Sequence, residues 1–399
     1  MRFTTAEICA ATNGDQFGRA CEVEGVTIDS RQIDVGPAAT APLFVPIVAE
    51  RDGHDFISAA VRSGVNAYLT SGPIEAGTAI RVQDTALALT ALGAHARDRL
   101  PDRVVGVTGS VGKTSLKDLL RSAGATTWRT WANPGSFNNE LGVPITLANA
   151  PDDSELVVVE MGARGVGHIA ELCDFARPTV GIVTVVAGAH LEQFGDLDGV
   201  AAAKSELIRA LPDDGIAVLN ADDDRVAAMA SMAPCRVVTF GVGDGDVRAT
   251  GIDLDSDLRA RFRLTSPWGE VDVHLGVAGA HQVTNALGAA AAALAMGATP
   301  EAVAEGLAVS SLSDHRMKLL ESPGGFRVLD DSYNANPTSM RAALEALAAL
   351  ETGRRFAVLG TMAELGDAGE AAHQEMAQAA DELGIVVVTV AEPAYRVTG

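Results

Sequence analysis

One stretch constrains the fold more than any other: residues 104–120, which read VVGVTGSVGKTSLKDLL. Its first four residues are rich in valine, which predicts a buried strand of a parallel sheet. Leucines at helical spacing predict a helix over residues 115–123. A glycine-rich turn at residues 109–114 joins the strand to the helix. The sequence therefore predicts an α/β unit built around a strand, a turn and a helix.

The turn has the short pattern G-x-x-G-K-T, because Val107 stands where the longer Walker pattern has glycine. Glycines let backbone N–H groups converge on a phosphate, and the helix N-terminus adds positive potential. We expect Lys113 to reach the outer phosphates and Thr114 to hold Mg²⁺. The alternative is an ordinary turn with a surface lysine. Only four lysines stand beside 26 arginines, which favours a function for this one.

Composition limits the class of protein. A chain of 399 residues, 47% of them hydrophobic, has room for two or three domains. Its formal net charge of −22 argues against a nucleic-acid partner. We predict no signal peptide and no membrane insertion. Scattered cysteines predict reduced thiols and hence a cytoplasmic protein. These are Cys9, Cys21, Cys173 and Cys235.

Residues 1–100 are predicted to form a first unit of short strands and helices. Asp29, Ser30 and Arg31 directly follow a predicted strand at residues 26–28. Side chains at a strand end can reach a ligand, and a polar trio with an arginine suits a diphosphate or a sugar. A simple polar turn is the interpretation that these three residues favour when taken alone. Further strands are expected at residues 43–48, 67–70 and 79–82.

Residues 101–312 are predicted to form a central unit in which strands alternate with helices, as in a parallel sheet. Because ligands bind at the carboxyl ends of such strands, Glu160, His190 and Asn220 are expected to converge near Lys113. Residues 247–275 alternate between polar and apolar, which predicts an antiparallel ribbon. The remaining strands are expected at residues 155–160, 179–186, 216–220 and 236–240. Helices are expected at residues 198–210 and 300–308, and a long alanine-rich helix that contains Asn285 is expected after His281.

A third unit is expected over residues 313–399. Its predicted strands are residues 326–329, 356–359 and 385–390, and its helices are residues 339–350 and 368–383. The first strand is followed by DDSYNANP, from Asp330 to Pro337, and the second by GTMAELG. These polar segments are candidate binding loops.

The candidate metal ligands are Thr114, Glu160, His190 and Lys204. Mg²⁺ prefers oxygens, which Thr114 and Glu160 supply. His190 is either a ligand of a second ion or a histidine with its hydrogen bonds satisfied locally. Lys204 alone would be interpreted as a solvated lysine on a helix.

The sequence resembles the Mur ligases, in motifs that run in family order from residue 29 to residue 366. The segments that carry this resemblance are Asp29-Ser30-Arg31, Asp52-Gly53-His54, TGSVGKTS from Thr108, GSFNNELGVP from Gly135, Glu160-Met161-Gly162, AHLEQFG from Ala189, AKSEL from Ala203, LNADD from Leu219, His281 with Asn285, Arg316-Met317, DDSYNANP from Asp330 and MAELG from Met362. The resemblance implies a three-domain α/β architecture. It has a UDP-sugar domain (residues 1–100), a central P-loop ATPase domain (101–312) and a shortened Rossmann-like domain (313–399).

The resemblance also implies an ATP-dependent ligase that joins D-Ala-D-Ala to UDP-N-acetylmuramoyl-tripeptide through an acyl phosphate. It implies a monomer that uses ATP and two Mg²⁺ ions, with Lys204 carbamylated to serve as a carboxylate ligand. His190 and Lys204 would hold the second ion. The implied catalytic residues are Lys113, Glu160, His190 and Lys204. The implied ATP-binding residues are Thr108, Gly109, Ser110, Val111, Gly112, Lys113, Thr114, Ser115, Asn285, Arg316 and Asp331. The implied substrate-binding residues are Asp29, Ser30, Arg31, Asn138, Asn139, Asn334 and Asn336.

Three features depart from the family pattern. Residues 36–42 form a longer link than usual, and Ala49 replaces the usual glycine before Asp52. The family's last strands and helix, with their Lys-Gly-Ser-Arg segment, do not follow residue 390. Two alternative functions stay open: a sister ligase that adds another amino acid, and a nucleotide-binding paralogue without activity. The D-N-P-R segment typical of the diamino-acid ligase is missing, which weighs against the first alternative. Intact Lys113, Glu160, His190 and Lys204 weigh against the second.

Overall fold

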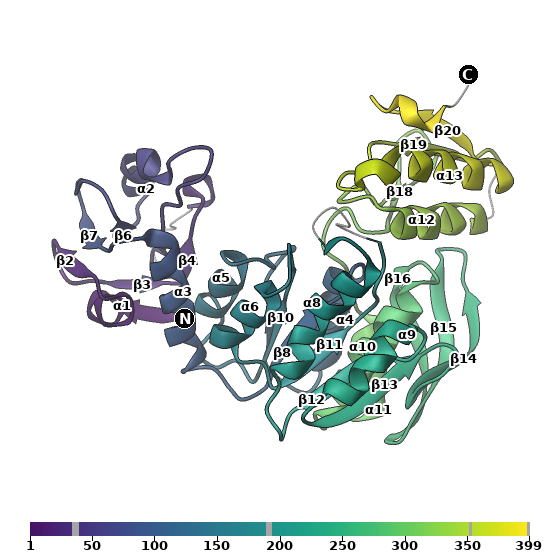
Figure 1. Cartoon of the computed structure of the whole chain (residues 1–399), viewed down its shortest axis with the longest axis horizontal. Coiled ribbons are helices and arrows are strands. Elements are labelled where there is room, and N and C mark those ends of the chain that lie inside the picture. Colours follow the sequence, from purple (N-terminus) through teal and green to yellow (C-terminus); the bar gives the residue numbers. More distant parts are fainter. Residues whose placement is uncertain (34–39, 189–193, 351–352, 397–399) are drawn as a thin grey trace.

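The computed structural model describes residues 1–33, 40–188, 194–350 and 353–396. The chain folds into three successive units (Figure 1). The first is built on a five-stranded sheet and the second on a nine-stranded sheet. The third contains two two-stranded sheets and stands over the part of the central unit that carries β14 to β16 (Figure 1).

The sheet of the first unit has the strand order β2-β7-β6-β5-β4. Strands β4 to β7 pair in parallel, and β2 pairs antiparallel with β7. A separate antiparallel pair joins β1 to β3. The elements are β1 Arg2–Thr4, α1 Thr5–Thr12, β2 Asp15–Phe17, β3 Glu22–Glu24, β4 Val26–Thr27, η1 Ser30–Gln32, β5 Leu43–Phe44, η2 Gly53–Phe56, α2 Ile57–Arg62, β6 Ala67–Thr70, β7 Thr78–Arg81 and α3 Thr85–Arg97.

The strand predicted at residues 43–48 is wrong in its length, because only Leu43–Phe44 form a strand. Pro46 has no N–H to donate to a neighbouring strand, so regular pairing ends before it. The strand predicted at residues 67–70 is confirmed. Strands β1 to β3 were not predicted, since each has only three residues.

The central sheet has the order β16-β15-β14-β13-β12-β11-β8-β10-β9 and is parallel from β9 to β14. The predicted antiparallel ribbon is confirmed for β15 and β16. However, β14 also extends the main sheet, because Phe240 and Val247 pair in parallel. The strands are β8 Val104–Thr108, β9 Thr130–Ala132, β10 Leu156–Glu160, β11 Val180–Val183, β12 Ile216–Asn220, β13 Arg236–Gly241, β14 Val247–Leu254, β15 Arg259–Ser266 and β16 Gly269–Ala278.

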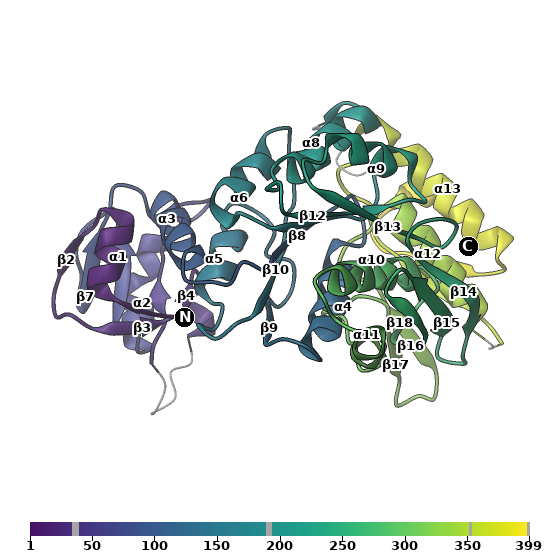
Figure 2. The same ribbon diagram turned by 90° about the horizontal axis from the view of Figure 1, so that it is seen from below.

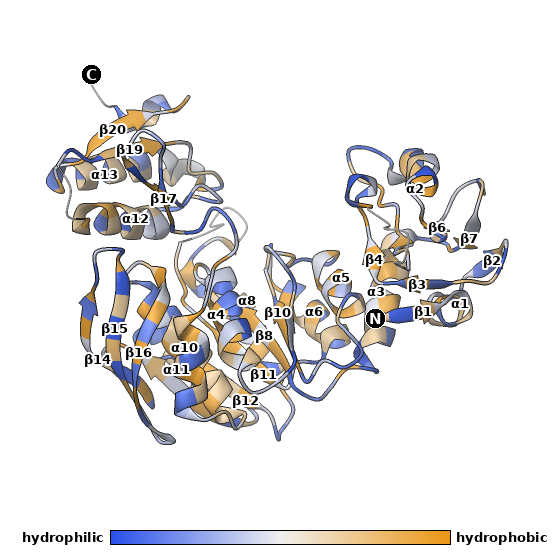
Figure 3. Cartoon of the chain, turned by 180° about the vertical axis from the view of Figure 1, so that it is seen from behind, coloured by the Kyte–Doolittle hydropathy of each residue, from blue (hydrophilic) through white to orange (hydrophobic). Residues whose placement is uncertain are grey.

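Helices cover both faces of this sheet, and Figure 2 shows α6, α8 and α9 on one face and α4, α10 and α11 on the other. Successive strand residues point to opposite faces. In β10, Val158 therefore packs toward α4 and α10, whereas Val157 and Val159 pack toward α5 and α6. Hydrophobic colour marks β8 and β10 in Figure 3. The helices are α4 Lys113–Ala125, α5 Gly142–Ala148, α6 His168–Ala176, α8 Leu197–Arg209, α9 Asp224–Ala228, η3 Met229–Met232, α10 Gln282–Ala295 and α11 Pro300–Ala308.

The third unit pairs β17 with β18 antiparallel and β19 with β20 in parallel. Strand β17 was missed because its sequence, KLLE, lacks β-branched and aromatic residues. The third unit has a hydrophobic core of its own, which lies between α13 and the β19–β20 pair. Only a small cluster, which includes Leu258 and Leu350, packs it against the central unit. The elements are β17 Lys318–Glu321, β18 Arg327–Asp330, α12 Pro337–Ala349, β19 Phe356–Leu359, η4 Gly366–Ala368, α13 Gly369–Glu382, β20 Val386–Thr389 and η5 Pro393–Tyr395.

The first and central units, in contrast, share one hydrophobic cluster. Leu89 and Leu92 of α3 belong to it together with Val143 of α5. Asn149 adds a polar link, since its Oδ1 accepts from the N–H of Val26 at 2.8 Å and its Nδ2 donates to the Val26 carbonyl at 3.0 Å. The third unit therefore has a far smaller apolar attachment than the first.

We expect Asn149→Ala to lower the free energy of unfolding by about 2–3 kcal/mol, because both polar groups of Val26 lose a partner. Urea unfolding followed by circular dichroism measures the change. Asn66→Ala is the control, since Asn66 is exposed and its side chain makes no recorded bond. It should stay within about 0.5 kcal/mol of the parent. Equal effects of the two substitutions would contradict a role for the Asn149 link.

Candidate functional site

The turn between β8 and α4 has the backbone of a phosphate-binding loop. Gly109 has φ of 147° and Gly112 has φ of 84°, values that disfavour residues with a side chain. A Cβ at Gly109 would lie 1.8 Å from Oγ1 of Thr184, and one at Gly112 would lie 2.5 Å from Oδ1 of Asn285. Both glycines are thus required by conformation and by space, and the loop leads directly into the N-terminus of α4.

Lys113 folds back over this loop. Its Nζ donates to the carbonyls of Gly109 at 2.8 Å and Ser110 at 3.3 Å. Burial lowers the pKa of the Lys113 ammonium, and the Glu160 carboxylate opposes that shift. The loop therefore holds a cation directly above its converging amides.

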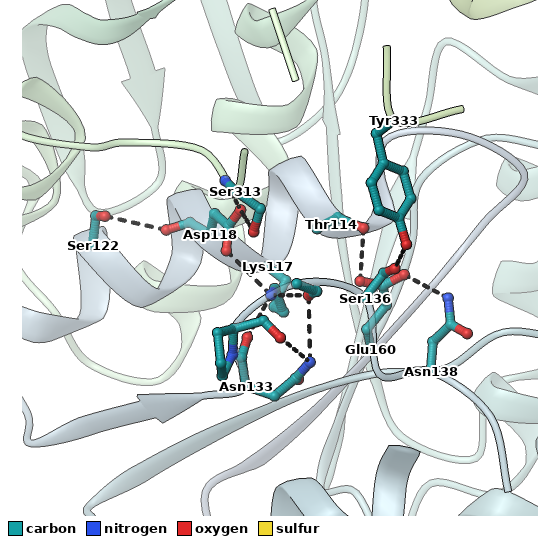
Figure 4. Close-up of polar contacts among 12 residues, drawn as sticks. Thr114, Lys117, Asp118, Ser122, Asn133, Ser136, Asn138, Glu160, Ser313 and Tyr333 are labelled. Atoms are coloured by element: carbon teal, nitrogen blue, oxygen red, sulfur yellow. Dashed lines mark hydrogen bonds and ion pairs between the residues drawn. The ribbon is translucent and has the colours of Figure 1, made fainter. Parts of the chain in front are cut away.

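Glu160 lies beside the loop because β10 pairs in parallel with β8, with Glu160 opposite Val107. Its Oε2 accepts from Oγ1 of Thr114 and its Oε1 accepts from Nδ2 of Asn138, both at 2.8 Å (Figure 4). The side chain is nearly inaccessible, with 1% of the residue exposed. These oxygens form a cluster that suits a hard cation such as Mg²⁺.

Lys204 approaches the same cavity from α8. It is 5% exposed, and no side chain or carbonyl among the described residues is recorded as its hydrogen-bond partner. Burial, with a smaller contribution from Lys113, lowers the pKa of Lys204 to about 7. Lys204 is therefore not the solvated lysine that its sequence alone suggests. His190 lies outside the described residues.

Asn285 reaches the loop from the first turns of α10. Its Nδ2 donates to Oε1 of Gln282 at 2.9 Å, and Nε2 of Gln282 lies 2.9 Å from Nε2 of His281. Burial lowers the pKa of His281 to about 4, so its imidazole is neutral at pH 7. Three neutral polar side chains in contact with one another thus border the phosphate loop.

The third unit supplies the opposite wall. The Arg316 guanidinium lies 4.2 Å from the ring centroid of Tyr333, and its buried Nε has no partner among the described residues. Asp331 accepts from the N–H of Met317 at 3.1 Å, and burial raises the pKa of its carboxyl to about 6. The Tyr333 hydroxyl is hydrogen-bonded to Ser136 of the central unit (Figure 4). A buried donor without a partner in this wall suggests an acceptor from a ligand.

All these groups border one cavity of about 1050 Å³, which residues of all three units line. Leu87 and Thr90 represent the first unit there. The predicted site residues that line the cavity are Gly109, Ser110, Val111, Gly112, Lys113, Thr114, Ser115, Asn138, Asn139, Glu160, Lys204, Asn285, Arg316, Asp331, Asn334 and Asn336.

Other predicted site residues lie elsewhere. Thr108 is buried at the end of β8 and does not line the cavity. Asp29, Ser30 and Arg31 also lie outside it, at the carboxyl end of β4. There Asp29 accepts from the N–H of Arg31 and pairs with its guanidinium at 2.8 Å, as a polar turn would.

Two predicted substrate-binding residues have structural bonds as well. Asn139 accepts from the N–H of Gly142 at 2.8 Å, at the start of α5. Asn336 caps α12, because its Oδ1 accepts from the N–H of Ser339 at 2.9 Å. Their side chains border the cavity while holding the ends of helices.

Sequence reasoning missed several residues of the site. Thr184 sits beneath Gly109, and no local pattern marks it. Ser136 and Tyr333 lie in segments that the sequence singled out, but nothing in the sequence shows that they meet. Lys117 does not line the cavity, but its burial in α4 was also missed, although it is one of only four lysines.

Comparisons with known proteins point to a single family. Residues 107–293 match the family described as Mur ligase middle domain, and residues 315–397 match the Mur ligase glutamate ligase domain. The UDP-N-acetylmuramoyl-tripeptide–D-alanyl-D-alanine ligase of Escherichia coli K12 is 38% identical over 96% of this chain and 84% of its own length. The enzyme of that name from Bacillus subtilis is 34% identical over 93% and 80%.

Solved structures agree. A crystal structure of MurF from Acinetobacter baumannii has a TM-score of 0.87 and 33% identity, covering 98% of this chain and 86% of that one. The Thermotoga maritima MurF in complex with ADP has a TM-score of 0.75 and 26% identity, covering 93% and 89%. Fold and site thus define a P-loop amide-bond ligase of three units. The chain belongs to the Mur ligase family.

Two features were searched for in the described part of the chain: clusters of metal-binding side chains and helices that could span a membrane. It holds no group of three His, Cys, Asp or Glu side chains arranged for a metal ion. None of its helices combines the length and the apolar character needed to cross a membrane.

We expect Asp331→Asn to raise the free energy of unfolding at pH 8, because it removes a buried charge while an oxygen stays available to Met317. The folded carboxyl has a raised pKa, so its cost is absent at low pH and grows between pH 4 and pH 6. The gain should be about 1 kcal/mol larger at pH 8 than at pH 5. Urea unfolding at both pH values measures it. A gain that does not depend on pH would contradict this account.

Proposed function

We propose that the chain joins D-alanyl-D-alanine to UDP-N-acetylmuramoyl-tripeptide and in doing so converts ATP to ADP and phosphate. The observation that carries this proposal is the convergence of the phosphate loop and Glu160 in one cavity that all three units line. Relatives with this printed activity support the choice of substrates. The ADP complex of the Thermotoga maritima enzyme supports ATP as the nucleotide.

The residues present fit a nucleotide. The loop amides and Lys113 would bind the outer phosphates of the nucleotide. The loop can take this conformation because glycines stand where Thr184 and Asn285 leave no space for a Cβ. The unpartnered Nε of Arg316 would find its acceptor on a phosphate. Asn285 would border the adenine, and Asp331 would accept from a ribose hydroxyl.

Thr114 and Glu160 would hold one Mg²⁺, with Asn138 fixing the orientation of the carboxylate. We propose His190 and Lys204 for a second ion. Bound Mg²⁺ would neutralise charge on the transferred phosphoryl group. An amine with a pKa of about 7 has a substantial fraction of free base near neutral pH, and the free base can attack CO₂. The nitrogen–carbon bond forms, one proton is released, and the carbamate supplies carboxylate oxygens.

The chemistry then has two steps. The terminal carboxylate of the tripeptide attacks the γ-phosphorus, ADP leaves, and an acyl phosphate forms. The amine of D-Ala-D-Ala attacks that carbonyl, loses a proton, and phosphate leaves. Lys113 and the loop amides would stabilise negative charge in the transfer step, which depends mainly on positioning and electrostatics. Contact of the third unit through Tyr333 would help to exclude water from the acyl phosphate.

A sister ligase for another amino acid is the second candidate. The diaminopimelate-adding ligase has a TM-score of 0.56 and 19% identity to this chain, a likeness of fold alone. The much closer likeness to MurF favours D-Ala-D-Ala. We further propose a cytoplasmic monomer. Four free cysteines, including Cys173, whose thiol pKa burial raises to about 12, fit a reducing compartment.

Phosphate release with ATP, Mg²⁺ and UDP-N-acetylmuramoyl-tripeptide should depend on added D-Ala-D-Ala. Mass spectrometry should find the pentapeptide product. Glycine, glutamate and diaminopimelate in place of the dipeptide are the controls that detect a sister ligase. Folded protein that binds ATP but shows no dipeptide-dependent turnover would falsify the proposed function and favour a paralogue without activity.

Lys204→Ala should lower kcat about 100-fold or more, since it removes a proposed metal ligand. Short carboxylates such as formate or acetate should restore part of the activity by filling the vacated space. Lys318→Ala is the matched control, because Lys318 is exposed and its one ion-pair partner among the described residues is Asp314, at 3.0 Å. Full activity of Lys204→Ala in carboxylate-free buffer would refute the carbamate.

A further inference from the structure

Two neighbouring residues of α4 form a buried ion pair one helical turn beyond the phosphate loop. Lys117 is 0% exposed and Asp118 is 2% exposed. The Lys117 Nζ lies 3.2 Å from Oδ1 of Asp118. Neither side chain lines the cavity. Burying such a pair is costly unless every donor and acceptor is satisfied, so the bonds that it makes indicate what it does.

Lys117 holds the loop that follows β9. Its Nζ donates to the carbonyls of Asn133 and Gly135, both at 2.6 Å (Figure 4). With Asp118, these bonds account for all three of its protons. The loop continues to Ser136 and then to Asn138, which orients Glu160. Lys117 therefore fixes, from inside the protein, the segment that presents Asn138 to the cavity.

Asp118 holds the connection between α11 and β17. Its Oδ2 accepts from the N–H of Ser313 at 2.7 Å and from the Ser313 hydroxyl at 2.8 Å. Ser313 stands three residues before Arg316 and leads into the third unit. The Asp118 carboxylate thus holds the start of the segment that carries Arg316.

The two anchored segments meet again at the cavity. Ser136 of the loop is hydrogen-bonded to Tyr333, and the Tyr333 ring lies against the Arg316 guanidinium. Figure 4 shows the ion pair behind the loop and Tyr333 on its other side. The third unit has only a small apolar attachment, so polar anchors of this kind carry more of its positioning.

We propose that Lys117 and Asp118 are positioning residues that fix the loop at residues 133–138 relative to the connection at residues 309–317, and so align Asn138 and Arg316 across the cavity. The proposal rests on the proposed function, because the rate that it concerns is that of ligation. A misplacement of about 1 Å can lower such a rate about 100-fold. Nucleotide affinity should fall much less than kcat, since Lys113 is held by the carbonyls of the phosphate loop itself and Arg316 adds only one of the proposed phosphate contacts.

The mild test is Ser313→Ala, which deletes one bond to Asp118. The matched control is Ser122→Ala on the same helix, because the Ser122 hydroxyl donates only to the Asp118 carbonyl within that helix, at 3.1 Å. We expect Ser313→Ala to lower kcat about 10-fold, because the segment that carries Arg316 keeps only the backbone bond to Asp118 and is positioned less precisely. The Kd for a fluorescent ATP analogue should stay within twofold. Equal kcat values for the two variants would overturn the role of Asp118.

The strong test is the double variant Lys117→Met with Asp118→Asn. Removing both charges at similar volume keeps the core filled and leaves no lone buried charge. We expect a folded protein with kcat lowered about 100-fold and a nucleotide Kd that rises far less than kcat falls. Hydrogen exchange should rise in residues 133–138 and 310–316 relative to Ser122→Ala. A folded double variant with the kcat of the parent protein would overturn the proposal.

Failure of the proposed function is recognised separately. It appears as absence of dipeptide-dependent turnover in the parent protein, before any variant is compared. In that case hydrogen exchange decides the positioning proposal. Faster exchange in both segments of the folded double variant supports it, and parental exchange in either segment overturns it.

Discussion

The parallel pairing of β8 with β10 is the constraint on which the rest of the site depends. It places the carboxyl ends of both strands at one edge, where β8 continues into the phosphate loop and β10 ends at Glu160. The bond between Thr114 and Glu160 then joins residues 46 positions apart in sequence. Because both strands are fully buried, a shift in their register would disrupt the packing on both faces of the sheet as well as separate these groups.

The second feature of the structure is the burial of lysine side chains in the central unit. Lys113, Lys117 and Lys204 are three of only four lysines in the chain; Lys117 and Lys204 are buried in the central unit, and Lys113 is half-buried at the cavity. Burial lowers the pKa of all three ammonium groups, which is tolerable only where carbonyls or carboxylates compensate. Lys113 and Lys117 have such partners. Lys204 has no such partner among the described residues, which supports the carbamate that we propose for it.

The three units contribute unequally to the cavity. The first shares a hydrophobic cluster with the central unit, so their relative positions are fixed by apolar burial. The third has its own core and contacts the central unit through a small cluster and polar bonds. The third unit is therefore attached to the central unit less firmly than the first unit is.

Local sequence determined the central α/β unit, the phosphate loop and most strand positions, because valine runs and glycine turns act over a few residues. The resemblance to the family supplied the roles that we propose for Glu160, Arg316 and Asp331. Tertiary structure alone decided that Thr184 lies under Gly109, that Ser136 meets Tyr333, and that Lys117 and Asp118 join two distant segments. It also left Asp29, Ser30 and Arg31 outside the cavity. Such contacts join residues far apart in sequence, and no local pattern encodes them.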